Sequence, residues 1–271
     1  MSHAMPPVRR ALIPCGGLGS RMLSVTGGAP KELITVAGVP VLERVMAECV
    51  ASGIEEIVII VGPGKHAVGD FARSRVGARG MPAHVAVVEQ PYPRGLADAI
   101  RLGRHFANRQ PLAVALPDNL FLSDDPAMGQ VVDTHRRTGL NVVGVVEIPA
   151  TDAERRGPTA VYPGRVDGND FHIERVPDKG ERSTRFDTGG ASSAFTGIGR
   201  FVFASDAFDA IDEVEQTLPP DKELDDVPVM QLLLSRARLI GCRIRGRFLD
   251  VGLPEGYAEA NTLLAGPPRS P

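Results

Sequence analysis

The sequence predicts an α/β fold, a doubly wound, mostly parallel (mixed) sheet with helices on both faces. Apolar strand-like runs alternate with segments whose apolar residues recur at helical spacing, which is the order of repeated β-α-β units. One run, residues 57–61, is apolar throughout, as expected for a parallel strand covered on both faces. The 271 residues, 43% of them hydrophobic, suffice for one large domain or two small ones.

The first half of the chain carries the regular alternation. Apolar residues at helical spacing, together with Gly53 as a terminator, predict an amphipathic helix over 40–51. The other elements expected in this half are strands at 11–14, 85–88, 112–116 and 141–148, and helices at 65–75, 96–103 and 128–135. Because the carboxyl ends of parallel strands meet at one edge of such a sheet, the segments that follow the strands should border one crevice.

The second half is less regular. Residues 159–176 predict a hairpin around Asp167-Gly168-Asn169, and the polar, glycine-containing segment 178–193 predicts a mobile loop. The elements expected after it are a helix within 226–237, a strand pair within 239–249 and a final helix over 254–264. Pro254 suits the first turn of that helix, because proline lacks only an N–H that would be unpaired there.

Composition excludes several classes of partner. The net charge of −3 gives no general attraction to nucleic acid or to an anionic membrane, so any anion site must be local. The three cysteines, Cys15, Cys49 and Cys242, have no C-x-x-C spacing, which predicts reduced, buried thiols in a cytoplasmic protein. No run approaches 18 apolar residues, and the first residues lack the apolar core of a signal peptide.

The strongest chemical signal follows the first apolar run. The glycines of Cys15-Gly16-Gly17-Leu18-Gly19-Ser20-Arg21 allow several backbone N–H groups to approach one phosphate. Arg21 and Lys31 add two cations beside this loop, so the segment predicts a polyphosphate site. Met22 replaces the third glycine of a dinucleotide fingerprint, and no P-loop string follows a strand. Cys15 lies where a nucleophile would lie, but no histidine is near it in sequence.

Three polar residues lie at other strand ends. Asp118 and Asp250 each follow an apolar run, and carboxylate oxygens suit Mg²⁺, which also keeps water and phosphate ligands. The alternative for each aspartate is to cap the turn or helix that follows. Gln90 carries an amide donor and acceptor in one plane, which matches the imide edge of a pyrimidine, and the alternative is an ordinary polar residue at a strand end.

The string Gly16-Gly17-Leu18-Gly19-Ser20-Arg21, followed by Pro30-Lys31-Glu32, resembles the signature of the sugar-1-phosphate nucleotidyltransferases. Together with the segment 48–58, it looks most like the bacterial UTP–glucose-1-phosphate uridylyltransferases. Later landmarks follow in the same order, namely Glu89-Gln90, Gly95-Leu96-Ala97, Leu116-Pro117-Asp118, Phe195-Thr196-Gly197-Ile198-Gly199-Arg200 and Asp250-Val251-Gly252. The resemblance implies a Rossmann-like nucleotide-diphospho-sugar transferase fold in one domain, 8–265, between tails 1–7 and 266–271. Its nucleotide-binding part would span about 8–150 and its sugar-binding part, with the small hairpin and loop, about 151–265.

The resemblance also implies a reaction and a set of site residues. An oxygen of a sugar 1-phosphate, glucose 1-phosphate in the first place, attacks the α-phosphorus of a nucleoside triphosphate, UTP in the first place, and pyrophosphate leaves. The implied catalytic residues are Arg21 and Lys31, and the implied Mg²⁺ ligands are Asp118 and Asp250. The implied nucleotide-binding residues are Cys15, Gly16, Gly17, Gly19, Ser20, Glu32, Gln90, Gly95 and Asp118. The implied sugar-phosphate-binding residues are Asn119, Gly157, Glu174 and Arg175. Family members are commonly homodimers or homotetramers, and we expect the same here.

Two departures from the family pattern leave the substrates open. Glu174-Arg175 stands where the family usually has Glu-Lys, and Thr26 is followed by Gly27 where the uridylyltransferases often have lysine. One alternative is therefore the same reaction with dTTP, GTP, ATP or CTP and a modified sugar or cyclitol phosphate. An alternative of another class is a nucleotide-sugar-binding regulatory protein with little turnover. An NAD oxidoreductase is a weaker third hypothesis, because the dinucleotide fingerprint is incomplete.

Overall fold

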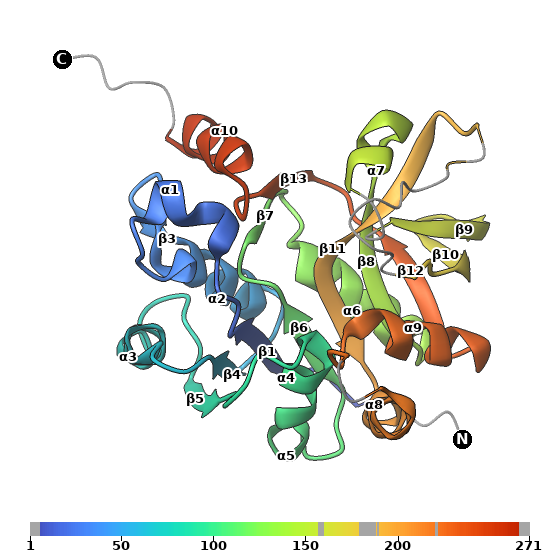
Figure 1. The fold of residues 1–271 in the computed structure, drawn as a ribbon, viewed down its shortest axis with the longest axis horizontal. Coiled ribbons are helices and arrows are strands. Elements are labelled where there is room, and N and C mark those ends of the chain that lie inside the picture. The colour runs from blue at the N-terminus through green and yellow to red at the C-terminus, as the bar shows by residue number, and fades with distance from the viewer. Residues whose placement is uncertain (1–5, 157–159, 179–187, 189, 220–221, 266–271) are drawn as a thin grey trace.

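A mixed sheet connects most of the molecule (Figure 1). The computed structural model describes residues 6–156, 160–178, 188, 190–219 and 222–265. In this part of the chain, nine strands form one sheet in the order β5 (His84–Glu89), β4 (Glu56–Val61), β1 (Arg10–Cys15), β6 (Leu112–Ala115), β11 (Ser193–Phe203), β8 (Asn141–Pro149), β12 (Leu239–Arg243), β10 (Asp170–Arg175) and β9 (Ala160–Asp167). The first four are parallel, and β11 enters antiparallel to both β6 and β8. The predicted mixed sheet is confirmed.

Helices cover both faces of this sheet, because its strands are apolar on both sides. In β1, Ala11 and Ile13 belong to one buried cluster and Leu12 belongs to the other. The first cluster also holds side chains of α2 (Val41–Ala51), α3 (His66–Ser74), α6 (Ala127–Thr138) and α10 (Pro254–Leu264). The second holds side chains of α4 (Leu96–Leu102), α5 (Arg104–Ala107), α8 (Asp206–Thr217) and α9 (Asp226–Ser235). Every helix of the described residues is too short or too polar to span a membrane.

The predicted hairpin is present as β9 and β10, which pair antiparallel on either side of Gly168. Strand β9 also pairs with β11, so β11, β8, β12, β10 and β9 form a closed ring of strands. Phe171 and Phe195 stack in this region with ring centroids 4.9 Å apart. A Cβ on Gly241 would lie 2.2 Å from the Phe171 ring, so this stack requires glycine there. Much of the loop expected over 178–193 lies outside the described residues.

Both strands predicted within 239–249 exist, but the prediction that they pair with each other is wrong. Strand β12 lies between β8 and β10 in the large sheet. Strand β13 (Arg247–Asp250) instead pairs with β7 (Asn119–Leu122), with Asp250 opposite Asn119. The cause is a tertiary partner more than a hundred residues away, which local alternation does not reveal. As a result, the two segments that contain Asp118 and Asp250 lie side by side.

The last helix returns to the N-terminal part of the chain (Figure 1). It packs beside a small hairpin of β2 (Thr35–Val36) and β3 (Val39–Pro40). The Tyr257 hydroxyl donates to the Thr35 carbonyl at 3.0 Å, and the Ala37 N–H donates to Asn261 Oδ1 at 2.9 Å. The segment that carries Asp250 is therefore held at both ends, by β7 and by this hairpin.

A buried ion pair fixes the loop after β6. Arg200 of β11 is fully buried, and its guanidinium donates to both carboxylate oxygens of Glu48 at 2.9 and 2.7 Å. The same guanidinium donates to the carbonyls of Leu116 and Asn119, at 3.0 and 2.7 Å. These two carbonyls flank Asp118, so the position of that aspartate depends on the Arg200–Glu48 pair. Burial lowers the pKa of Arg200, but the charge and hydrogen bonds of Glu48, together with smaller contributions from Cys49 and Asp118, outweigh burial and raise this pKa.

We predict that Glu48→Gln destabilises the protein by about 3 kcal/mol, because it leaves the Arg200 charge buried without a counter-charge. Urea unfolding followed by circular dichroism measures this. The control is Glu55→Gln, which breaks the exposed Arg9–Glu55 pair and should change the free energy of unfolding by no more than about 0.5 kcal/mol. Equal effects of the two substitutions would contradict the assigned role of Glu48.

Candidate active site

The glycine-rich loop leaves the carboxyl end of β1 and packs closely against its neighbours. A Cβ on Gly16 would lie 2.9 Å from Gln90 Oε1, so a larger residue would displace that side chain. Gly19 has a φ of 66°, a left-handed conformation that glycine adopts without strain. Short helical turns follow, η1 (Ser20–Met22) and α1 (Leu23–Thr26). The loop thus presents its backbone to the adjacent space with little side-chain cover.

That space is a cleft of about 540 Å³ at the carboxyl ends of β1, β5 and β6. Its size falls in the usual range for small-molecule sites. The predicted site residues that line it are Gly16, Gly17, Gly19, Ser20, Arg21, Lys31, Gln90, Gly95 and Asp118. Segments that are far apart in sequence therefore meet at one cleft, as a doubly wound fold requires. Sequence reasoning missed other lining residues, among them Leu96 and Glu223.

Lys31 and Asp118 form an ion pair at the wall of the cleft. Lys31 lies in the short turn η2 (Lys31–Leu33), and Asp118 follows β6. Burial lowers the pKa of Lys31, but the Asp118 charge and hydrogen bond, together with the Glu32 charge, outweigh burial and raise that pKa above its usual value. The nearby Arg21 charge lowers it slightly. Lys31 is therefore positively charged throughout the neutral pH range.

Lys65, which sequence reasoning missed, anchors the glycine-rich loop. Its ammonium donates to the carbonyls of Cys15 and Gly17, at 2.9 and 2.6 Å, and to Glu32 Oε1 at 2.9 Å. Three donors on one ammonium group thus join the start of the loop to the turn that carries Lys31. A sequence signal was present, because Lys65 follows Gly62-Pro63-Gly64 at the end of a predicted strand.

Two residues assigned to the nucleotide lie behind the cleft rather than on its surface. Glu32 is 1% exposed and pairs with Lys65. Cys15 is fully buried, and burial raises the pKa of its thiol well above the usual value. A thiol that stays protonated is a poor nucleophile, which agrees with the argument against a nucleophilic Cys15. The contacts of Cys15 and Glu32 with Lys65 support the loop from below.

The carboxylates of Asp118 and Asp250 converge on Gly252. A Cβ on Gly252 would lie 2.9 Å from Asp118 Oδ2 and 3.2 Å from Asp250 Oδ1. The Gly252 N–H also donates to Asp250 Oδ1 at 3.1 Å. The described residues contain no cluster of three or more side chains that could hold a metal. Two carboxylates beside a cleft of small-molecule size nevertheless fit Mg²⁺, which takes its other ligands from water and phosphate.

Gln90 lies between the glycine-rich loop and the start of α4. Its Nε2 donates to Asp98 Oδ2 at 2.8 Å and to the Gly95 carbonyl at 3.3 Å. Gly95 has a φ of 106°, and a Cβ there would lie 2.4 Å from the Leu224 carbonyl. Glycine is thus required where residues 222–224 pass over this end of the cleft. Sequence reasoning identified Gln90 and Gly95 but missed Asp98 and Leu224.

Three of the residues assigned to the sugar phosphate, Asn119, Glu174 and Arg175, are not among the described residues that line the cleft. Asn119 is 9% exposed, and its amide donates to the Ile198 carbonyl at 2.9 Å. Glu174 and Arg175 end β10, where the Arg175 guanidinium lies 4.0 Å from the centre of the Tyr162 ring. Gly157 lies outside the described residues. The roles of these four residues stay predictions.

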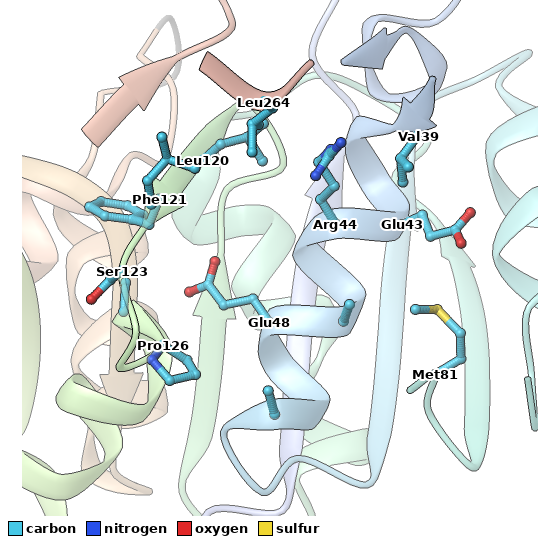
Figure 2. A pocket seen from close by; sticks show the side chains of 14 residues that line it. Val39, Glu43, Arg44, Glu48, Met81, Leu120, Phe121, Ser123, Pro126 and Leu264 are labelled. Carbon is cyan, nitrogen blue, oxygen red and sulfur yellow. The ribbon is translucent and has the colours of Figure 1, made fainter. Parts of the chain in front are cut away.

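A second cavity, of about 420 Å³, lies between α2 and β7 (Figure 2). Most of its lining is apolar, including Leu120, Phe121 and Leu264. Figure 2 shows Glu48 extending from α2 toward β7, so the ion pair with Arg200 borders this cavity. None of the sequence-predicted site residues lines it among the described residues. The residues predicted to bind phosphate therefore gather in the other cleft.

We predict that Lys65→Met destabilises the protein and weakens binding of inorganic tripolyphosphate at least tenfold by calorimetry. The substitution removes three hydrogen bonds from the loop and leaves the buried Glu32 carboxylate without its counter-charge. Adding Glu32→Gln should restore much of the stability but not the binding, because the loop still lacks its anchor. Arg9→Met, an equal change of charge at an exposed site, serves as the control. Tripolyphosphate binding by Lys65→Met at wild-type affinity would refute the anchoring role.

Comparisons with known proteins agree with this geometry. The sequence profile described as nucleotidyl transferase matches residues 10–266. A UTP–glucose-1-phosphate uridylyltransferase from Staphylococcus epidermidis is 27% identical over 273 residues, which cover 94% of this chain and 91% of that protein.

Solved structures share the fold. A UDP-glucose pyrophosphorylase complexed with UDP-glucose is 22% identical with a TM-score of 0.79, covering 94% of this chain and 98% of its own. A UTP-bound UGPase from Acinetobacter baumannii is 21% identical with a TM-score of 0.77, covering 94% and 93%. The resemblance seen in the motifs is confirmed. Because the profile spans nearly the whole sequence, this chain belongs to the nucleotidyl transferase family.

Proposed function

We propose that this protein transfers a uridylyl group from UTP to glucose 1-phosphate and releases pyrophosphate. The main support for the proposal is the cleft, where the glycine-rich loop lies beside two cations, Arg21 and Lys31, and the carboxylate of Asp118. The relatives named above support UTP and glucose as the first substrates to test. We also propose one domain over 8–265, with its nucleotide-binding and sugar-binding parts, in a cytoplasmic homodimer or homotetramer.

The loop and its cations would hold the triphosphate. Gly16, Gly17 and Gly19 offer backbone N–H groups at the cleft surface, and polyphosphate oxygens are their natural acceptors. Arg21 has a planar fork that can contact two phosphate oxygens together, whereas Lys31 supplies a compact point charge. Because Lys31 is charged at neutral pH, it would neutralise the departing pyrophosphate without first taking up a proton.

Asp118 and Asp250 would hold Mg²⁺ by their carboxylates. When bound, the cation would neutralise phosphate charge and orient the phosphate oxygens. The Lys31–Asp118 pair keeps the Asp118 carboxylate at the cleft wall beforehand. The Arg200 hydrogen bonds on both sides of Asp118 fix its backbone in the same way. The chain thus orients this carboxylate before any ligand arrives, which lowers the entropy lost on binding.

The bond changes require no nucleophile from the protein. A phosphate oxygen of the sugar 1-phosphate forms a new bond to the α-phosphorus, and the bond from that phosphorus to the bridging β-phosphate oxygen breaks. The electron pair leaves with pyrophosphate. The protein supplies alignment of two anions and stabilisation of charge, and alignment alone can lower a barrier by several kcal/mol. The buried, protonated thiol of Cys15 takes no part in these changes.

The decisive assay is pyrophosphate release by the purified protein with UTP, glucose 1-phosphate and Mg²⁺. We expect release that requires all three. A matrix of dTTP, GTP, ATP and CTP with modified sugar and cyclitol phosphates then tests the alternative substrates. Binding of a nucleotide sugar by calorimetry, with no turnover anywhere in the matrix, would support the regulatory alternative and overturn the proposed reaction.

We predict that Asp118→Asn lowers kcat at least about a hundredfold and raises the Mg²⁺ concentration needed for half-maximal rate. The substitution removes one of two carboxylates and the partner of Lys31, and loss of one preorganised charge commonly has an effect of this size. Asp125→Asn is the control, because Asp125 pairs with Arg245 at an exposed site. Wild-type turnover in Asp118→Asn would remove Asp118 from the proposed metal site.

A further inference from the structure

We infer that Asp98 sets which end of the Gln90 amide faces the nucleotide base, and so makes Gln90 a hydrogen-bond acceptor only. The inference rests on the proposed function, because it concerns the base of the nucleotide. Gln90 lines the cleft, whereas Asp98 lies behind it and is 4% exposed. Asp98 would act as a positioning residue that restricts the substrate to bases with an N–H at ring position 3.

The hydrogen bonds of Gln90 determine the orientation of its amide. The Asp98 carboxylate and the Gly95 carbonyl can only accept, so the amide group 2.8 and 3.3 Å from them must be Nε2. An amide nitrogen carries two hydrogens, and these two acceptors use both. Oε1 therefore lies on the other side, where a Cβ on Gly16 would be 2.9 Å from it. Among the described residues, no side chain or backbone group is found donating to Oε1.

Asp98 is itself held in place. Arg101 donates to Asp98 Oδ1 at 2.8 Å, and Arg94 lies 3.8 Å from the same oxygen. Both arginines also pair with Glu215 of α8, at 2.6 and 3.1 Å. The two oxygens of Asp98 thus have different partners, with one turned to the arginines and the other to Gln90. Rotation of the Gln90 amide would place its Oε1 against a carboxylate oxygen, which is repulsive.

The fixed acceptor distinguishes bases by chemistry. Uracil and thymine carry a hydrogen on N3, which donates to an acceptor placed opposite it. Cytosine has a bare N3, which is itself an acceptor, so the same Gln90 Oε1 would face a lone pair. A site built around a buried hydrogen bond rejects an analogue that cannot complete it. We therefore expect UTP and dTTP to be used, and CTP and N3-methyl-UTP to be rejected.

The test compares kcat/KM for UTP and CTP in the wild-type protein and in Asp98→Asn. Asparagine offers a donor as well as an acceptor, so the Gln90 amide can rotate and present Nε2 to the cleft. We expect the UTP-to-CTP ratio of kcat/KM to fall about tenfold, the effect of one hydrogen bond. The change should lie mainly in KM, because the base is remote from the reacting phosphorus.

Glu215→Gln is the matched control. It removes a carboxylate from the same arginines but leaves the Asp98–Gln90 hydrogen bond in place. Its UTP-to-CTP ratio should stay within twofold of the wild-type ratio. If Asp98 were merely structural, Asp98→Asn would lower activity with both nucleotides equally and leave the ratio unchanged. That result, in a variant with a wild-type circular dichroism spectrum, would overturn the inference.

Two further measurements distinguish failure of the inference about Asp98 from misfolding of the variant and from failure of the proposed function. If Asp98→Asn fails to fold, Gln90→Met removes the acceptor, and it should lower kcat/KM for UTP about tenfold but not for CTP. Equal loss with both nucleotides would again overturn the inference. If the wild-type protein shows no turnover, the proposed function fails, and the affinities for UTP and CTP by calorimetry still test Asp98. Tight binding of CTP or N3-methyl-UTP by the wild-type protein would contradict the role of the fixed acceptor.

Discussion

The Lys65 ammonium group holds the glycine-rich loop in its observed shape. Glycine-rich segments lose the most backbone entropy on folding, so a loop of this kind needs a partner that fixes it. Lys65 contacts two loop carbonyls and the buried Glu32 carboxylate. Lys65 is neutralised by Glu32, and the cationic side chains among the described residues that line the cleft are those of Arg21 and Lys31. The Lys65–Glu32 pair thus supports the loop from behind, while Arg21 and Lys31 line the cleft.

The charges of Lys31 and Asp118 at the cleft wall neutralise each other before a ligand arrives. Lys31 is paired with Asp118, so neither group is left as an isolated, half-buried charge. Under the proposed function, a metal-bound triphosphate would bring an anion for Lys31 and a cation for Asp118 at the same time. The Lys31–Asp118 pair would then be replaced by two new ion pairs with the ligand. Neither Lys31 nor Asp118 would be left desolvated and unpaired, before or after binding. Under the same proposal, a protein with a net charge of −3 would in this way bind a polyanion.

Local patterns predicted those elements whose partners are near in sequence or whose faces are strongly apolar. Helix α2, the β9–β10 hairpin and α10 lie close to their predicted positions. Strand β11 had no predicted bounds, because Gly197 and Gly199 interrupt its apolar pattern and its register shifts there. The β7–β13 pairing was missed because it is a long-range contact.

The same limit applies to the site. Motif residues such as Arg21 and Asp118 were identified because strand ends meet in this fold class. Lys65 and Asp98 were not, because a charged residue at the start of a helix is usually solvated. Only the tertiary structure shows that Asp98 is buried behind Gln90 and that Lys65 lies beneath the loop. Supporting residues depend on burial, which a single sequence does not report.

The β7–β13 pairing has a consequence for biosynthesis. On the ribosome, β1, β4, β5 and β6 emerge early and can begin to associate as parallel strands. Asp250 emerges well over a hundred residues later, and β13 and α10 must then return to β7 and to the hairpin near Thr35. The carboxylate pair is therefore assembled last, since contacts of such high sequence separation form slowly. A nascent chain can thus carry a formed glycine-rich loop before Asp118 and Asp250, the proposed Mg²⁺ ligands, have come together.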